Sequence, residues 1–141
     1  MIGSILLAVD ASPATPATSD YARFLAKRLG ATLRVVYVVD ARLVNMSYWT
    51  DYGALSVPTT TFSEEMNSML QGQGKELLQR IERLAEEDGL SCETEIRTGL
   101  PANQILEAAQ TADLIVLGRR GESSKLEESR GLGTVAERVV R

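Results

Sequence analysis

Two apolar runs, far apart in the chain, most constrain how it can fold. The first covers residues 5–9 and ends at Asp10, and the second covers residues 114–117 and opens into Gly118. Apolar runs of this length, bounded by turn residues, are typical of strands buried on both faces of a parallel sheet. In open parallel sheets, ligands bind beyond the carboxyl ends of the strands, where the strand order reverses. The runs therefore predict neighbouring central strands with a ligand site at their carboxyl ends.

Between these runs, strand and helix patterns alternate. We expect strands over 3–9, 32–39, 91–98 and from 114, and helices from Thr15 to Gly30, from a capping box at 61–64 to about Asp88, after Pro101 and after Thr134. Residues 41–60 are expected to form a long, irregular insertion. Regular alternation favours right-handed βαβ units. The sequence thus predicts an α/β fold with a doubly wound, mostly parallel open sheet.

Length and composition limit what this chain can be. Its 141 residues suit a single domain over 1–141, and its net charge of −4 argues against nucleic acid as a partner. No apolar stretch approaches the roughly 18 residues of a transmembrane helix, and no secretory signal is recognisable, so we expect a cytoplasmic protein without a membrane partner. The chain has no histidine, which excludes imidazole-based catalysis and histidine metal sites within it.

A glycine loop follows the second apolar run. Gly118 and Gly121 enclose Arg119 and Arg120, and Thr134 stands further on, before a helical pattern. Glycine-rich turns before a helix N-terminus can offer backbone N–H groups to an anion. A phosphate-bearing nucleotide is therefore the predicted ligand, although turns alone also explain the glycines.

Two polar side chains have a purely structural alternative. Asp10 is either an acceptor for the ligand or a turn aspartate that caps the next segment. Thr134 is either a phosphate donor or a helix N-cap, and a hydroxyl can serve both roles because its donor and lone pairs are separate. Cys92 is predicted to be a small apolar residue with no redox role.

At this stage the chain resembles the universal stress protein family, and the resemblance spans nearly all of it except the 41–60 insertion. The matching pieces are residues 5–12, residues 38–40, Gly99-Leu100-Pro101-Ala102 with Ile105, residues 113–121 and residues 133–139. The resemblance implies a five-stranded sheet in the order 3-2-1-4-5, and many members bind ATP through a Gly-x-x-Gly loop followed by Gly-Ser or Gly-Thr. Here the loop before Gly133 is longer than in that pattern.

The resemblance also implies roles for individual residues. Ala8, Val9 and Asp10 would hold the nucleoside, and the backbone of Val38 would read the adenine edge. The phosphate end would be held by Gly118, Arg119, Arg120, Gly121, Gly133, Thr134 and Val135. The expected cofactor is ATP or AMP, with Mg²⁺ or Mn²⁺ bridging the phosphates of ATP. The function so implied is a nucleotide-binding sensor or signalling domain of the stress response.

No residue is assigned a catalytic role, so activity beyond slow ATP hydrolysis is not expected. Two alternatives stay open. One is a dimerising stress protein that binds no nucleotide. The other is an adenylate-forming enzyme, although the Ser-Gly-Gly-x-Asp motif of such enzymes is absent near the first strand.

The end of the chain carries one further expectation. The printed sequence stops inside the last predicted helix, at Arg141, and the family's fifth strand would follow there. Because an open apolar strand edge invites pairing with another chain, we expect a second universal stress protein domain as partner. That domain would be a second copy in a homodimer or the other half of a tandem protein, unless the chain is truncated.

Overall fold

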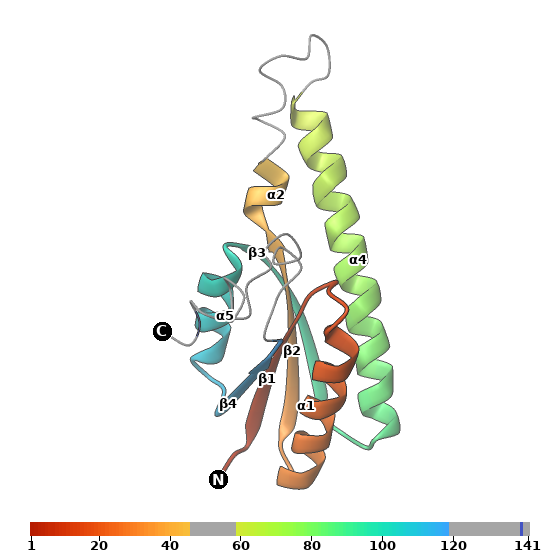
Figure 1. Ribbon diagram of the computed structural model, residues 1–141, viewed down its shortest axis with the longest axis vertical. Helices are drawn as coiled ribbons and strands as arrows, with labels where there is room; N and C mark the ends of the chain where they lie inside the picture. The colour runs from red at the N-terminus through yellow and green to blue at the C-terminus, as the bar shows by residue number, and fades with distance from the viewer. Residues whose placement is uncertain (46–58, 119–138, 140–141) are drawn as a thin grey trace.

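The computed structural model describes residues 1–45, 59–118 and 139. The elements alternate along the chain (Figure 1). They are β1 (Ser4–Val9), α1 (Thr15–Leu29), β2 (Thr32–Asp40), α2 (Ala41–Asn45), α4 (Thr59–Glu87), β3 (Cys92–Gly99), α5 (Pro101–Ala109) and β4 (Leu114–Leu117).

The four strands form one parallel sheet in the order β3-β2-β1-β4. β1 lies between β2 and β4, and Ala8 is in register with Val36 on one side and with Leu117 on the other. This confirms the predicted doubly wound sheet and the predicted pairing of the two apolar runs. Among the described residues no fifth strand is present, so β4 ends the order there.

Helices cover both faces of the sheet. α1 and α4 pack on one face and α5 on the other (Figure 1). The face under α1 and α4 carries the larger core, which includes Ile5, Leu7 and Val35, while Leu6 and Val36 pack with Ala108 on the α5 face. β1 is therefore buried on both sides, as its apolar run predicts. All four residues of β4 are only half-buried, so the same prediction is wrong for β4.

The ends of α1 follow the expected chemistry. Pro16 stands in the first turn, where its missing N–H costs no hydrogen bond. Gly30 ends the helix with a left-handed φ of 64°, and its backbone N–H donates to the carbonyl of Ala26. Because β1 ends at Val9 and α1 begins at Thr15, Asp10 and Ser12 lie in the short turn between the two elements, directly beyond the carboxyl end of β1.

The region after β2 differs from expectation. Instead of an irregular insertion from residue 41, the five-residue helix α2 continues directly from β2. α4 begins at Thr59, so Thr61 lies inside the helix and the predicted capping box is wrong. Gly74 has a packing reason, because a Cβ there would come within 2.4 Å of the buried ring of Tyr37 on β2. No helix in the described ranges is long and apolar enough to cross a membrane.

Candidate functional site

The carboxyl ends of β1 and β4 meet at one edge of the sheet. Because Ala8 is in register with Leu117, Gly118 and Asp10 follow within two residues of this pair, at the same edge of the sheet. In a doubly wound sheet, crossovers run from this pair to opposite faces, which opens a crevice at the strand ends. The structure thus brings together the aspartate and the first glycine that the sequence singled out.

Asp10 is held in a tight turn. Its Oδ1 accepts a hydrogen bond from the backbone N–H of Ser12 at 2.9 Å and lies 3.1 Å from the hydroxyl oxygen of Thr15. The same hydroxyl is 2.6 Å from the backbone oxygen of Asp10. The turn-aspartate alternative is therefore what the geometry shows. It does not remove the ligand role, because a carboxylate offers about four lone-pair positions.

The other predicted nucleoside contacts divide between the two faces of the sheet. Ala8 and Val38 belong to the small apolar cluster on the α5 face. The side chain of Val9 is 8% exposed and packs on the opposite face, in the core beneath α1 and α4. Ala8 and Val38 therefore share one face of the sheet, and the side chain of Val9 lies on the other.

Charged groups that the sequence analysis did not single out lie close to Val38. Asp40, at the end of β2, pairs with the guanidinium of Arg42 at 2.8 Å and accepts the backbone N–H of Arg42 at 2.9 Å. This ion pair raises the pKa of Arg42. On β3, Arg97 is in register with Val38 and bonds the carboxylate of Glu95 at 2.7 Å. The alternation of side chains along β3 could have placed Arg97 on the α5 face from the sequence alone. Its neighbour Val38 follows only from the register of β2 with β3.

The phosphate end of the prediction is not covered by the structure. Gly118 is described and half-buried. The remaining predicted phosphate contacts lie outside the described residues: Arg119, Arg120, Gly121, Gly133, Thr134 and Val135. Their roles stay predictions.

Neither a metal cluster nor a reactive thiol is found in the part of the chain that the structure describes. No group of three or more Cys, Asp and Glu side chains there could hold a metal ion. Burial raises the pKa of the Cys92 thiol to about 11, and Glu82, Glu86 and Glu93 add to the effect. A thiol with so high a pKa is a poor nucleophile at neutral pH.

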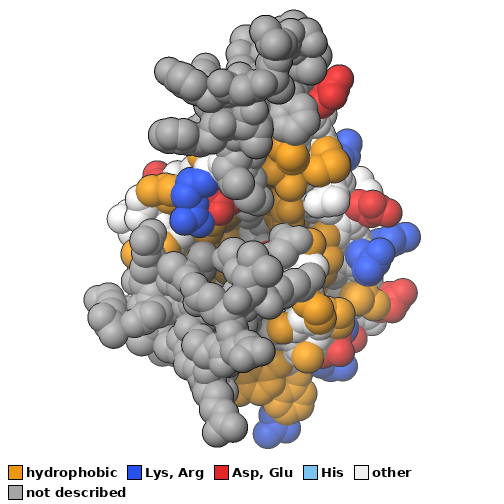
Figure 2. All heavy atoms as spheres, turned by 45° about the horizontal axis from the view of Figure 1, so that its top comes forward, with side chains coloured by type: hydrophobic (Ala, Val, Ile, Leu, Met, Phe, Trp, Pro, Cys, Tyr) orange, Lys and Arg blue, Asp and Glu red, His pale blue; other side chains and the backbone are white. Residues whose placement is uncertain are grey.

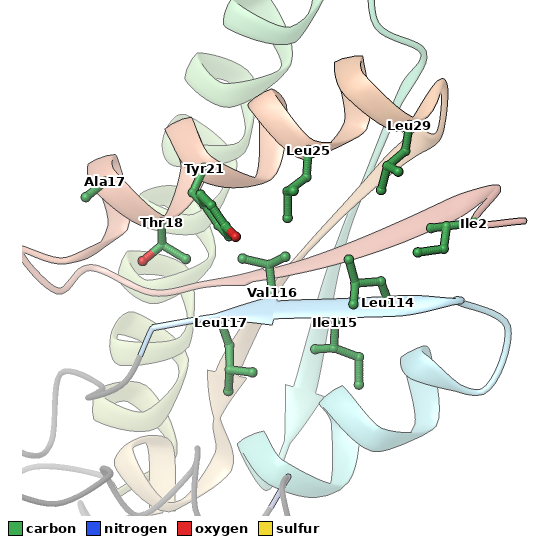
Figure 3. Close-up of a pocket in the computed structure, with 10 residues that line it drawn as sticks. All are labelled: Ile2, Ala17, Thr18, Tyr21, Leu25, Leu29, Leu114, Ile115, Val116 and Leu117. Atoms are coloured by element: carbon green, nitrogen blue, oxygen red, sulfur yellow. The ribbon is translucent and has the colours of Figure 1, made fainter.

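A second surface lies along β4 and the outer side of α1, and we name it the α1–β4 groove. It encloses about 730 Å³. Figure 3 shows Tyr21, Leu25 and Leu29 reaching from α1 toward Leu114 and Val116. Its lining is completed by Ile2, Ala17, Thr18, Ile115 and Leu117. Hydrophobic side chains also reach the surface on the side that carries α1 in the space-filling view (Figure 2). Side-chain exposure at Tyr21 is 58%, so part of this apolar surface faces solvent.

The described residues form an open parallel α/β fold in which β1 and β4 mark a topological switch point. The model of the universal stress protein family matches residues 1–141, and the chain belongs to this family. Universal stress protein YxiE of Bacillus subtilis is 33% identical over 141 residues, which cover 99% of this chain and 92% of that relative. Universal stress protein MJ0531 of Methanocaldococcus jannaschii is 32% identical over 139 residues, covering 97% and 75% respectively.

Solved structures share the fold. The hypothetical protein MJ0577 superimposes with a TM-score of 0.79 at 22% identity, over 99% of this chain and 89% of that one. Two more distant neighbours contain a nucleotide. An Arabidopsis thaliana family member with AMP bound has a TM-score of 0.59 at 20% identity, over 98% and 83% of the chains. A universal stress protein in complex with cAMP has a TM-score of 0.60 at 18% identity, over 99% and 89%.

Proposed function

We propose that this protein binds ATP or AMP at the carboxyl edge of its sheet and acts as a sensor or signalling domain in a cytoplasmic stress response. The observation that supports the proposal is the register of Ala8 with Leu117, which brings Asp10 and Gly118 to the same edge of the sheet. Fold neighbours with AMP and with cAMP support a nucleotide as the ligand class.

The nucleoside end would lie over the α5 face. There Ala8 and Val38 are partly buried apolar residues that would contact the base, and the main chain of Val38 would pair with the adenine edge. Asp10 would accept a hydrogen bond from the sugar. Asp10 lies just beyond the end of β1, and Val38, although paired with Arg97 of β3, lies one residue beyond Tyr37, where the pairing of β2 with β1 ends.

The phosphates would extend toward the glycine loop. Gly118, Gly121 and Gly133 would offer backbone N–H groups, with Val135 adding its own N–H and Thr134 its hydroxyl. Arg119 and Arg120 would contribute positive charge. Mg²⁺ or Mn²⁺ would accompany ATP by bridging its phosphates, since such ions often take most of their ligands from phosphate and water.

Purified protein provides the first test. Mass spectrometry after denaturation should detect co-purified ATP or AMP, and titration with ATP and Mg²⁺ should raise the melting temperature. Ligand at a hundred times its dissociation constant stabilises by about 2.7 kcal/mol, so a true site is readily visible. A Gly121→Val variant should lose the shift while its ligand-free melting temperature stays close to that of the parent. If millimolar ATP leaves the parent unmoved, the dimerising alternative without nucleotide takes over.

We further propose a second universal stress protein domain, here a second copy of this chain, as the partner at the α1–β4 groove. The groove combines the outer side of a strand, which can pair with another chain, with exposed apolar side chains of α1. Closed two-fold association would place the same surface of both copies together.

Light scattering coupled to size exclusion tests the partner. Tyr21 lines the groove and Phe24 does not, although both are 58% exposed on the same helix. Tyr21→Lys should shift the protein toward monomer, and the matched Phe24→Lys control should not. A monomeric parent, or equal behaviour of both variants, would contradict the proposal.

A further inference from the structure

We infer that Gln104, in the first half of α5, is a specificity-determining residue that pairs with the N6 and N7 atoms of an adenine, and that Arg97 of β3 positions its amide. The inference rests on the proposed nucleotide function and deepens it. The sequence alone marks neither residue as a ligand contact.

The order of the strands places Arg97 and Gln104 beside the proposed base contact. Because β1, β2 and β3 are neighbours in this order, a base that extends from Asp10 past Val38 on β2 points toward β3. Arg97 is in register with Val38, and such neighbours in a parallel pair present their side chains on the same face of the sheet. The α5 face beside Val38 therefore carries Arg97 and the residue of α5 that it bonds, Gln104.

The amide of Gln104 has one favoured orientation. Nη1 of Arg97 donates to its Oε1 at 3.4 Å. Because an arginine side chain only donates hydrogen bonds, it faces the amide oxygen and not the amide nitrogen. The guanidinium is itself held by Glu95, whose Oε1 is 2.7 Å from Nε of Arg97. Arg97 is thus a restrained donor that turns Nε2 of Gln104 away from itself.

The same amide lies directly against the backbone of Gly99, the last residue of β3. A Cβ at Gly99 would come within 2.7 Å of Nε2 and 3.0 Å of Cγ of Gln104. Glycine at this position, with a φ of 155°, leaves the space that the amide occupies. Gly99 is in register with Asp40, the last residue of β2, so the amide lies at the carboxyl edge of the sheet.

The chemistry of this amide matches an adenine. Within residues 1–45, 59–118 and 139, Nε2 donates to no acceptor, and Gln104 is only half-buried. A carboxamide pairs with adenine by donating to N7 and accepting from the N6 amino group. A guanine would bring its O6 against Oε1, and two acceptors repel each other. The N1 side of the base is left for the main chain of Val38.

The experiment compares dissociation constants for ATP, 7-deaza-ATP and 3-deaza-ATP, each with Mg²⁺, by isothermal titration calorimetry. The 7-deaza analogue has a carbon in place of N7, so the parent should bind it about five- to tenfold more weakly than ATP. The 3-deaza analogue keeps N7 and should bind like ATP. Gln104→Met keeps the length of the side chain and removes the amide, so the ratio of the dissociation constants for 7-deaza-ATP and ATP should fall close to one.

Arg97→Met tests the positioning role. Without the guanidinium the amide can turn, so the ratio should fall toward one, whereas Arg97→Lys keeps a donor and should retain more of it. Asn103→Leu is the matched control, because Asn103 is the exposed neighbour of Gln104 on the same helix, and it should keep the parental ratio. The ratio separates recognition from stability, since a general loosening of α5 weakens all three nucleotides together.

The outcomes are distinguishable. An unchanged ratio in Gln104→Met, or an equal loss for all three nucleotides, would overturn the role of Gln104 and leave the proposed function intact. A parental ratio in Arg97→Met would overturn the positioning role of Arg97. A parent that binds ATP and 7-deaza-ATP alike, or that discriminates against 3-deaza-ATP instead, would overturn the N7 contact. A parent that binds none of them would overturn the proposed function, and this inference with it.

Discussion

Carboxylates at the two ends of the β1–β4 pair do different work. At the amino end, Asp113 accepts the backbone N–H groups of Gly3 and Ser4 at 2.8 and 3.0 Å, from residues 110 and 109 positions away. At the carboxyl end, Asp10 bonds Ser12 and Thr15, only two and five positions away. The bonds of Asp113 connect segments far apart in the chain, and these two bonds of Asp10 close a local turn.

The difference shows where long-range hydrogen bonds fasten the fold and where a local turn presents a polar side chain at the proposed binding edge. The hydrogen bonds of Asp113 connect segments that are far apart in the sequence, so this side chain restrains both strands at the amino edge of the sheet. At the carboxyl edge, Asp10 closes its turn with Ser12 and Thr15, and Asp40 closes the next turn with Arg42. Both turns carry a carboxylate, from Asp10 and Asp40, that could accept a hydrogen bond from a bound molecule. This arrangement is what a binding edge needs, because functional groups are presented on loops that a rigid sheet positions.

The largest expected effect is a loss of affinity for ATP when Asp10, at the carboxyl edge of the sheet, is replaced. Asp10→Asn keeps an oxygen for Ser12 and Thr15 but loses the negative charge, so the affinity for ATP should fall about tenfold to a hundredfold. The melting temperature of the ligand-free protein should change little. Calorimetric titration measures the first quantity and a thermal scan the second. Unchanged affinity would show that Asp10 serves only its turn.

The reciprocal change is at the amino edge. Asp113→Ala removes the acceptor of two backbone N–H groups, and the free energy of unfolding should fall by about 2 kcal/mol. Affinity for ATP should stay at the parental value under conditions in which the variant is folded. Urea denaturation provides the measurement. A stable variant with weakened ATP binding would reverse the assignment of the two edges.

A smaller effect is expected at Arg34, which also fastens the amino side. Its guanidinium donates to the hydroxyl of Thr111 at 2.8 Å, beyond the C-terminus of α5. Arg34→Leu should destabilise the protein by about 1 kcal/mol in urea, because a hydrogen bond and a favourable charge at a helix end are both lost. Arg80→Leu, at an exposed position of α4, serves as control and should have no comparable effect.

The smallest effect concerns Cys92, at the start of β3. Burial raises the pKa of its thiol from 9.0 to about 11. Between these pH values the unfolded chain has lost the thiol proton and the folded chain retains it, so the free energy of unfolding should decrease slightly as pH rises from about 9 to 11. The comparison is with Cys92→Ala, measured by urea denaturation at pH 8 and pH 10.5. Identical pH dependence in both proteins would contradict the raised pKa.

Much of the scaffold could be predicted from local patterns. The run before Asp10 gave a strand, Pro16 and Gly30 marked α1, and the alternation of elements gave a parallel sheet, because these signals act within a few residues. The half-buried state of β4 could not be predicted in this way. It depends on what lies beside the strand, which its own composition does not encode.

The site was predictable only in outline. The position of Asp10 after a strand predicted that it lies at the carboxyl edge of the sheet, but the bonds from Ser12 and Thr15 depend on how the turn closes. The neighbourhood of Val38 and Arg97 depends on the register of β2 with β3, which connects residues far apart in the chain. The capping box at Thr61 failed because α4 already begins at Thr59, two residues before it.

The central claim is that nucleotide occupies the crevice between the ends of β1 and β4. Backbone amide shifts in an NMR titration with ATP and Mg²⁺ test it most directly. The largest changes should fall on Ala8–Ser12, Val38 and Gly118, while Gly3, Ser4 and Leu33 at the amino edge stay unmoved. Changes centred on the amino edge or on Tyr21 and Leu114 in the α1–β4 groove would contradict the claim.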